Sequence, residues 1–174
     1  MAADFFTVEV WTRKGLQRFM VLFLIELSTR KVEVAGIAEA ANGLWMSQIG
    51  RNLTGAGEGI LHGRSYLIHD RDPLFTTEFL EMLADAGVKS VKLPPRSPNL
   101  NAHAERFVRT IKESCLKRMI LFGEESLRTA IYNFVAHYHT ERNHQGLANR
   151  PISPEPGHLG KAGTVQRRQR LGVC

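Results

Sequence analysis

An uninterrupted run of seven apolar residues, at positions 19–25, constrains the fold most, because a polar turn lies close to it on either side. The preceding segment, residues 4–11, is rich in β-branched and aromatic residues, and Arg13-Lys14-Gly15 separates the two as a turn signal. On the other side, Ser28-Thr29 leads into a third segment of strand character, residues 31–36. Strands joined by turns this short run antiparallel. The sequence therefore predicts a three-stranded antiparallel meander whose second strand is buried.

Helices and strands alternate after the meander. Apolar residues at helical spacing and short apolar runs predict the remaining elements, which are helices at 42–53, 78–86, 101–121 and 126–138 and strands at 66–70 and 88–93. Thr76 or Thr77 is the expected N-cap of the second helix, and Gly87 is its expected stop. This order predicts an α/β fold, a five-stranded mixed sheet flanked by helices, in one domain over residues 1–154. A basic, weakly structured tail is expected over residues 155–174.

Membrane and secreted classes are not supported by the sequence. No apolar run approaches the roughly 18 residues of a membrane-spanning helix. No secretory leader is expected, because Asp4 lies so near the start of the chain. The two cysteines, Cys115 and Cys174, are too few for a disulfide framework, so a reducing cytoplasm is the predicted compartment.

Positive charge is concentrated in the second half of the chain. The formal net charge is +6. Residues 99–120 contain five basic side chains against two acidic ones, and residues 137–174 contain six against two. Such an excess favours a polyanionic partner.

Three acidic residues lie where acids are unusual. Asp4 opens the first strand, Asp70 closes the strand at 66–70, and Glu105 falls one turn into the helix at 101–121. Most acids are solvated surface groups, and an acid in a first helical turn also favours the helix dipole. The other interpretation is a metal site, because carboxylates suit Mg²⁺ or Mn²⁺ and two such ions promote in-line phosphoryl displacement. Asp72 competes with Asp70 as a ligand, unless it forms an ion pair with Arg71.

Basic residues follow Glu105 at helical spacing. Arg109 and Lys112 come four and seven positions later, so they share its face of the helix. One interpretation is a Glu105–Arg109 pair that stabilises the helix by a few tenths of a kcal/mol. The other is that Arg109 and Lys112, with Arg106, bind DNA phosphates without reading sequence.

Four segments, taken together, resemble the catalytic core of the retroviral-integrase family, specifically bacterial insertion-sequence transposases with an Asp-Asp-Glu triad. They occur in family order between Asp4 and Pro154. The segments are Asp4-Phe5-Phe6-Thr7-Val8, residues 68–76, Ser97-Pro98-Asn99 with residues 101–107, and residues 138–147.

This resemblance implies a ribonuclease H-like fold and binding of two Mg²⁺ or Mn²⁺ ions. It places Asp4, Asp70 and Glu105 in the three ligand positions. It also implies DNA strand transfer by direct attack, without a covalent enzyme intermediate. The expected partners are mobile-element ends and target DNA, bound by a homo-oligomer in the bacterial cytoplasm. Without metal, Glu105 is expected to be displaced, because unneutralised carboxylates repel one another.

Two departures from the family pattern leave alternatives open. Only three residues precede Asp4, so the helix-turn-helix region that usually recognises element ends is not expected here. Asp72 and Pro73 stand where Gly-Ser is common. One alternative is a ribonuclease H-like nuclease that only hydrolyses, with Asp72 as the candidate for its fourth carboxylate. The other is a truncated, non-catalytic DNA-binding remnant.

Overall fold

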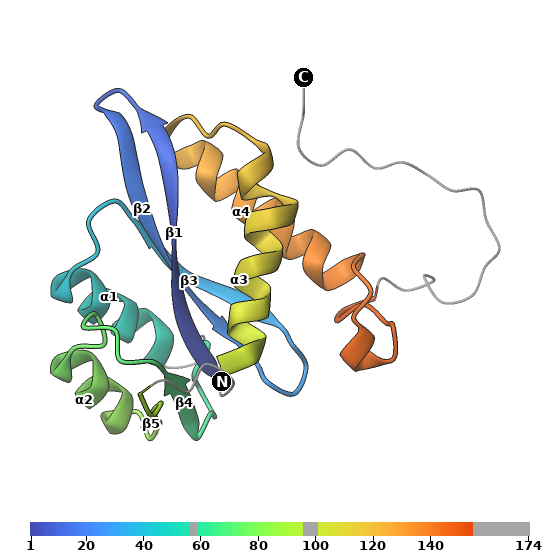
Figure 1. The fold of residues 1–174 in the computed structure, drawn as a ribbon. Helices are drawn as coiled ribbons and strands as arrows, with labels where there is room; N and C mark the ends of the chain where they lie inside the picture. Colours follow the sequence, from blue (N-terminus) through green and yellow to red (C-terminus); the bar gives the residue numbers. More distant parts are fainter. Residues whose placement is uncertain (56–58, 96–100, 155–174) are drawn as a thin grey trace.

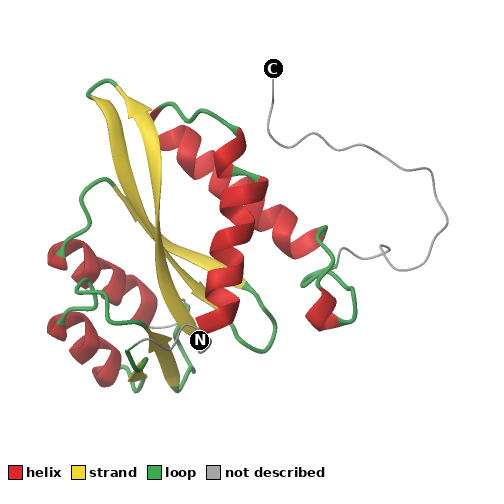
Figure 2. Cartoon of the chain, viewed as in Figure 1, coloured by secondary structure: helices red, strands yellow, loops and turns green. Residues whose placement is uncertain are grey.

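The computed structural model describes residues 1–55, 59–95 and 101–154, which form one sheet with helices on both faces (Figure 1, Figure 2). The predictions made for Ser97-Pro98-Asn99 and for the tail at 155–174 lie outside these residues. The strands are β1 (Ala2–Thr12), β2 (Gly15–Ile25), β3 (Val32–Ala38), β4 (Tyr66–His69) and β5 (Lys89–Lys92). The α-helices are α1 (Gly43–Thr54), α2 (Thr77–Asp85), α3 (Ala102–Ser114) and α4 (Gly123–Thr140). Within the described ranges, none of these helices has the length and apolarity needed to cross a membrane.

The sheet has the strand order β3-β2-β1-β4-β5. β1, β2 and β3 pair antiparallel, which confirms the predicted meander. β4 pairs parallel to β1, and β5 pairs parallel to β4, so the sheet is mixed, as predicted. β1 therefore lies at the centre of the sheet, between the meander and the two parallel strands.

Alternate side chains of β1 face two different apolar cores, because successive residues of a strand point to opposite sides of a sheet. Ala2, Phe6 and Val8 pack in the cluster that contains the buried residues of α3 and α4. Ala3 packs in the cluster formed with α1 and α2. Figure 1 shows the same division, with α1 and α2 on one face of the sheet and α3 and α4 on the other. Asp4 has the same parity as Ala2 and Phe6, so its side chain lies on the α3 face.

The helices on the opposite face begin and end within one residue of the predicted positions. The Asn42 side chain accepts a hydrogen bond of 3.0 Å from the backbone N–H of Trp45, which caps α1. Thr76, and not Thr77, caps α2 by accepting 3.2 Å from the N–H of Phe79. Gly87 follows α2 with a φ of 78°, a left-handed conformation that ends a helix at little cost when the residue is glycine.

α3 is shorter than the sequence predicts, and the prediction of a helix reaching about residue 121 is wrong. The helix ends at Ser114 and is followed by a 3₁₀ turn, Leu116–Arg118. The carbonyl of Leu121 accepts a hydrogen bond of 2.9 Å from the N–H of Trp11 at the far end of β1. Leu116 and Leu121 are both buried. Burying both residues while reaching β1 requires the chain to leave the helical path.

Candidate active site

Asp4 lies within β1, and Asp70 directly follows the end of the neighbouring strand β4. Ala2 of β1 is the register partner of Ile68 of β4, and the Ile68 N–H donates 3.0 Å to the carbonyl of Met1. Asp4 follows Ala2 by two residues within β1, and Asp70 follows Ile68 by two residues, one residue beyond the end of β4. Because the two strands run parallel, this pairing places Asp70 near Asp4, close enough for the charge of Asp70 to raise the pKa of Asp4. The backbone N–H of Phe5 donates 2.8 Å to Asp4 Oδ1.

Asp70 and Asp72 shape the loop that leaves β4. Asp70 Oδ1 accepts 3.0 Å from the N–H of Asp72, and Asp72 Oδ1 accepts 2.8 Å from the N–H of Leu74. The Asp72 carbonyl also accepts 3.1 Å from the N–H of Phe75. Bonds from an aspartate to the backbone two residues on are typical of tight turns. Each carboxylate therefore gives one oxygen to the loop, and the loop fixes the position of both.

The side chain of His69 forms a hydrogen bond to the backbone of Asp70. Its ring is fully buried and lies 4.2 Å, between centroids, from the ring of Phe75. Nδ1 is 2.6 Å from the Asp70 carbonyl, and Nε2 is 2.7 Å from Ser90 Oγ on β5. A carbonyl only accepts, so Nδ1 carries the proton and the Ser90 hydroxyl donates to Nε2. Burial lowers the pKa of His69, which favours this neutral form.

Ser90→Ala is expected to lower the free energy of unfolding by about 1–3 kcal/mol, because it leaves the buried Nε2 of His69 without a donor. Urea unfolding monitored by circular dichroism measures the change. Ser90→Thr keeps the hydroxyl on a β-strand and serves as the control, with a much smaller expected loss. Equal stability of the alanine variant and the wild type would contradict the assigned hydrogen bond.

Glu105, the third candidate metal ligand, lies on α3. The helix packs on the sheet through Ala104, Phe107 and Ile111, and Glu105 lies in its exposed first turn. Burial raises the pKa of Asp4 to about 6, against the opposing hydrogen bond from the Phe5 N–H. The charges of Asp70, Glu105 and Asp72, in that order of size, raise the pKa of Asp4 further. The other three acids selected from the sequence therefore act electrostatically on Asp4.

The carboxylate oxygens of the four acids are donors that suit a hard divalent cation, although they do not converge on a single position. Among the described residues, no three His, Cys, Asp or Glu side chains lie close enough together to hold a metal ion. Asp4, Asp70, Asp72 and Glu105 take part in none of the ion pairs found in the described ranges. Asn101 Oδ1, one turn before Glu105, is buried and has no hydrogen-bond partner among the residues that the structure describes. Like charges repel when no cation neutralises them, and carboxylate and amide oxygens are the ligands that Mg²⁺ and Mn²⁺ accept.

The three basic residues predicted to bind DNA have different surroundings. Lys112 is half-buried, with Nζ 5.9 Å from the centre of the Phe6 ring on β1. Arg109 is exposed, and among the ion pairs of the described residues it does not pair with Glu105. Arg106 lines a cavity on the other flank of α3 together with Arg30 and Arg142. Sequence reasoning did not select Arg30 or Arg142, because nothing in the pattern of residues brings these positions together.

The chain resembles known proteins in part of its sequence and in its fold. Residues 86–151 match the sequence model of the family described as "Integrase core domain". No curated protein sequence gives a significant match. The structure is similar to a chain of the simian T-cell lymphotropic virus intasome in complex with PP2A regulatory subunit B56 gamma, with a TM-score of 0.60 and 13% identity. That comparison covers 97% of this chain and 60% of the intasome chain, so this chain spans less than two thirds of its length.

Two isolated catalytic domains are similar as well. The HTLV-2 integrase catalytic core domain, solved in complex with magnesium in a dimeric form, has a TM-score of 0.58 at 13% identity, over 87% of this chain and 92% of that domain. The Mos1 mariner transposase catalytic domain has a TM-score of 0.58 at 14% identity, over 78% of this chain and 68% of that chain. Identities this low establish a shared fold. The chain therefore has the ribonuclease H-like fold of integrase and transposase catalytic cores, and its residues 86–151 match the integrase core domain family.

Proposed function

We propose that this chain is the catalytic core of a metal-dependent polynucleotidyl transferase that joins DNA strands, as transposases and integrases do. Asp4, Asp70 and Glu105 are the proposed ligands of two Mg²⁺ or Mn²⁺ ions. The observation that carries the proposal is the half-buried Asp4 carboxylate, whose pKa is raised by burial and by three neighbouring acids. Holding so much like charge together is costly unless a cation binds there.

The proposed role of the chain's own residues is mainly to position the metal ions and the DNA strand. Asp4 is held in the central strand of the sheet, and Asp70 is held by its loop and by the His69–Ser90 contact. Glu105 comes from an exposed helical turn, so its side chain has room to move toward the two aspartates. Two divalent ions, once bound, supply the charge that lowers the pKa of an attacking water or 3′-hydroxyl and stabilises the departing 3′-oxygen. Rigid placement of these ligands is what orients a DNA strand for in-line attack.

DNA is the proposed partner, and the basic residues of α3 are its proposed contacts. Arg106, Arg109 and Lys112 come after Glu105 on the same helix. Phosphate contacts of this kind supply affinity without reading sequence. A homo-oligomer assembled on DNA, with mobile-element ends and target as substrates, is the most specific form of the proposal. The insertion-sequence origin inferred from the sequence belongs to the same proposal.

A hydrolytic nuclease is the second candidate, favoured by one observation. Asp72 acts electrostatically on Asp4, as a fourth active-site carboxylate would. The two candidates differ in the nucleophile, which is a DNA 3′-hydroxyl in strand transfer and water in hydrolysis.

A strand-transfer assay tests the proposal. The full chain is incubated with Mn²⁺, a labelled duplex that carries a free recessed 3′-hydroxyl, and a plasmid target. Labelled plasmid is the result expected for a transferase. Shortened oligonucleotide without labelled plasmid indicates the nuclease, and neither product together with no response to Mn²⁺ in thermal melting overturns both.

A further inference from the structure

A basic cavity of about 340 Å³ lies beside α3, on the flank away from the carboxylates. It is bordered by the β2–β3 turn, the first turns of α3 and the segment that follows α4. The residues that matter for its chemistry are Arg30, His103, Arg106, Tyr138, Arg142 and His144. The cavity is within the size range of small-ligand sites, which begins at roughly 300 Å³.

Three guanidinium groups share this cavity. No acidic side chain is among the described residues that line it. Within the described ranges, Arg30, Arg106 and Arg142 form none of the ion pairs. Arg142 lies over the Tyr138 ring, 5.9 Å from its centre.

The neighbouring acids are engaged with other groups. Glu26 pairs with Arg64, Glu33 pairs with Lys31 at 2.8 Å, and Glu141 binds His137 Nδ1 at 2.8 Å. The three arginines also act on the same side chains. Burial, then Arg30 and Arg106, lower the pKa of His103. All three guanidiniums oppose the rise that burial causes in the pKa of Tyr138.

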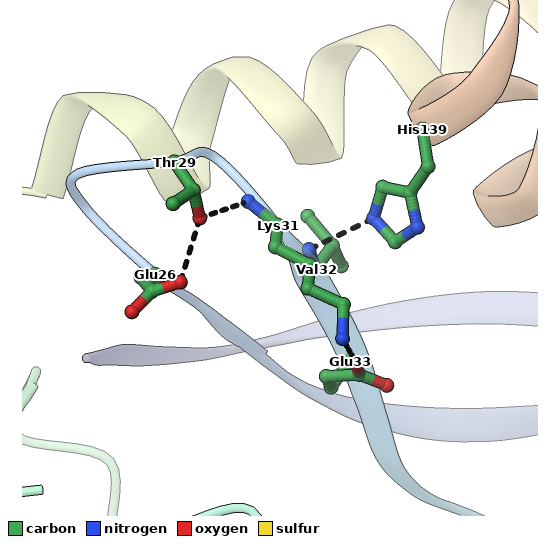
Figure 3. Close-up of polar contacts among 6 residues, drawn as sticks. All are labelled: Glu26, Thr29, Lys31, Val32, Glu33 and His139. Atoms are coloured by element: carbon green, nitrogen blue, oxygen red, sulfur yellow. Dashed lines mark hydrogen bonds and ion pairs between the residues drawn. The ribbon is translucent and has the colours of Figure 1, made fainter. Parts of the chain in front are cut away.

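The turn that carries Arg30 is held in place by several hydrogen bonds. Figure 3 shows the Thr29 hydroxyl donating 2.7 Å to Glu26 and accepting 3.2 Å from the N–H of Lys31. The same figure shows the N–H of Val32 donating 3.0 Å to Nε2 of His139 on α4. The N–H of Arg30 itself donates 2.8 Å to the carbonyl of Glu26.

Arg30 occupies a backbone conformation that usually belongs to glycine. Its φ is 68°, in the left-handed region, which costs roughly 1–2 kcal/mol for a residue with a Cβ atom. A non-glycine residue in such a position points to a role for its side chain. The cost is consistent with a guanidinium that is needed at this point of the cavity wall.

The cavity wall formed by Tyr138 and His144 is also held in place by hydrogen bonds and ring contacts. Nε2 of His144 lies 2.9 Å from the carbonyl of Tyr138, so this nitrogen donates the bond. The two rings meet edge to face with centroids 4.6 Å apart. The backbone N–H of His144 donates 3.2 Å to the carbonyl of Arg150, which closes the loop after α4. A cavity whose walls are held this way binds without a large ordering cost.

We infer that this cavity binds one backbone phosphate of a DNA strand, held by the guanidiniums of Arg30, Arg106 and Arg142. Guanidinium forks match phosphate oxygens and are preferred over ammonium groups where the contact is bidentate. Glu105 and Arg106 are successive residues of α3 and point roughly 100° apart around the helix. A strand that crosses α3 therefore meets the carboxylates on one flank and this cavity on the other. The inference rests on the proposed function only in naming DNA as the source of the phosphate.

Fluorescence anisotropy with a labelled 20-base-pair duplex tests the inference, with the full chain in EDTA and at several salt concentrations. The variants are Arg30→Gly, Arg142→Gln and the double variant, and Arg13→Gln in the β1–β2 turn is the control that removes the same charge elsewhere. Each cavity variant is expected to weaken binding several-fold and to reduce the slope of log affinity against log salt by roughly one. Arg13→Gln is expected to leave that slope unchanged. Arg30→Gly removes the left-handed strain, so its melting temperature is expected to equal or exceed that of the wild type.

The outcomes separate this inference from its rivals. Unchanged DNA affinity and salt slope in the double variant overturn it, whether or not the chain transfers strands. If inorganic phosphate raises the melting temperature of the wild type but not of the double variant, while DNA affinity is unchanged, the cavity is a free-phosphate site and the inference fails. Because EDTA removes divalent metal, a failed metal site leaves this assay unaffected.

Discussion

Asp70→Asn is expected to abolish strand transfer and hydrolysis, with a rate loss of roughly 10³-fold or more, since the charge stabilisation by bound metal is worth several kcal/mol and each 1.36 kcal/mol is a factor of ten. The same variant is expected to lose the rise in melting temperature that Mn²⁺ gives the wild type. A ligand at 100 times its dissociation constant stabilises the folded state by about 2.7 kcal/mol, so the lost response is large enough to measure. Thermal melting with and without Mn²⁺ and the strand-transfer assay give the two readouts.

Asp72→Asn is the matched control for this substitution. Asparagine keeps a side-chain oxygen, so Asp70→Asn still accepts from the N–H of Asp72 and Asp72→Asn still accepts from the N–H of Leu74. The loop is therefore preserved in both variants, and only the charge differs. If Asp72→Asn removes activity and the Mn²⁺ response while Asp70→Asn keeps both, the ligand has been assigned to the wrong aspartate.

Asp4→Asn is expected to make the metal-free protein more stable, by up to about 3 kcal/mol at pH 8. The pKa of Asp4 is about 6 in the folded chain and 3.8 in its ordinary environment. The folded state therefore holds the proton more tightly than the unfolded state, and the wild type loses stability as pH rises from about 4 through about 6. Asparagine avoids this loss because it never ionises, and its side-chain oxygen still accepts from the N–H of Phe5.

Urea unfolding in EDTA between pH 4 and pH 8 measures the effect. The difference between Asp4→Asn and the wild type is expected to be small at pH 4, to grow up to pH 6 and to stay constant above it. Glu9→Gln is the control on the same strand, because Glu9 forms only an exposed pair with Arg18. Its expected effect is within about 1 kcal/mol at every pH. A wild type as stable as Asp4→Asn at pH 8 would show that the carboxylate carries no electrostatic cost.

The elements that depend on local pattern could be predicted from the sequence. The meander follows from the apolar run and its two turns, and the N-cap of α2 follows from the threonines at 76 and 77. The selection of Asp4, Asp70 and Glu105 used strand ends and a helix start, and the β1–β4 pairing brings the strand that contains Asp4 beside the strand that Asp70 follows. Their role as ligands stays a prediction.

Features set by tertiary contact could not be predicted. The apolar stripe of α3 continues through Cys115 and Met119, so its periodicity gives no sign that the helix ends at Ser114. The chain beyond the helix bonds to β1 through Leu121 and Trp11, a tertiary contact that no local pattern encodes. The basic cavity was missed for the same reason, because Arg30, Arg106 and Arg142 meet only when α3, α4 and the β2–β3 turn pack together. Arg30 also occupies a left-handed position for which arginine is not a sequence signal.

The pairing of Ala2 with Ile68 has a consequence for the order of folding. The β1–β2 hairpin closes over the short turn between Thr12 and Gly15, whereas β1 and β4 meet across most of the meander and α1. Distant segments pair late, since closing a long loop costs entropy before any contact is gained. The aspartates are therefore expected to come together after the folding barrier, so Asp4→Asn should slow unfolding and leave the refolding rate unchanged. Stopped-flow refolding that became faster by the full stability gain would instead place the β1–β4 pair in the folding nucleus.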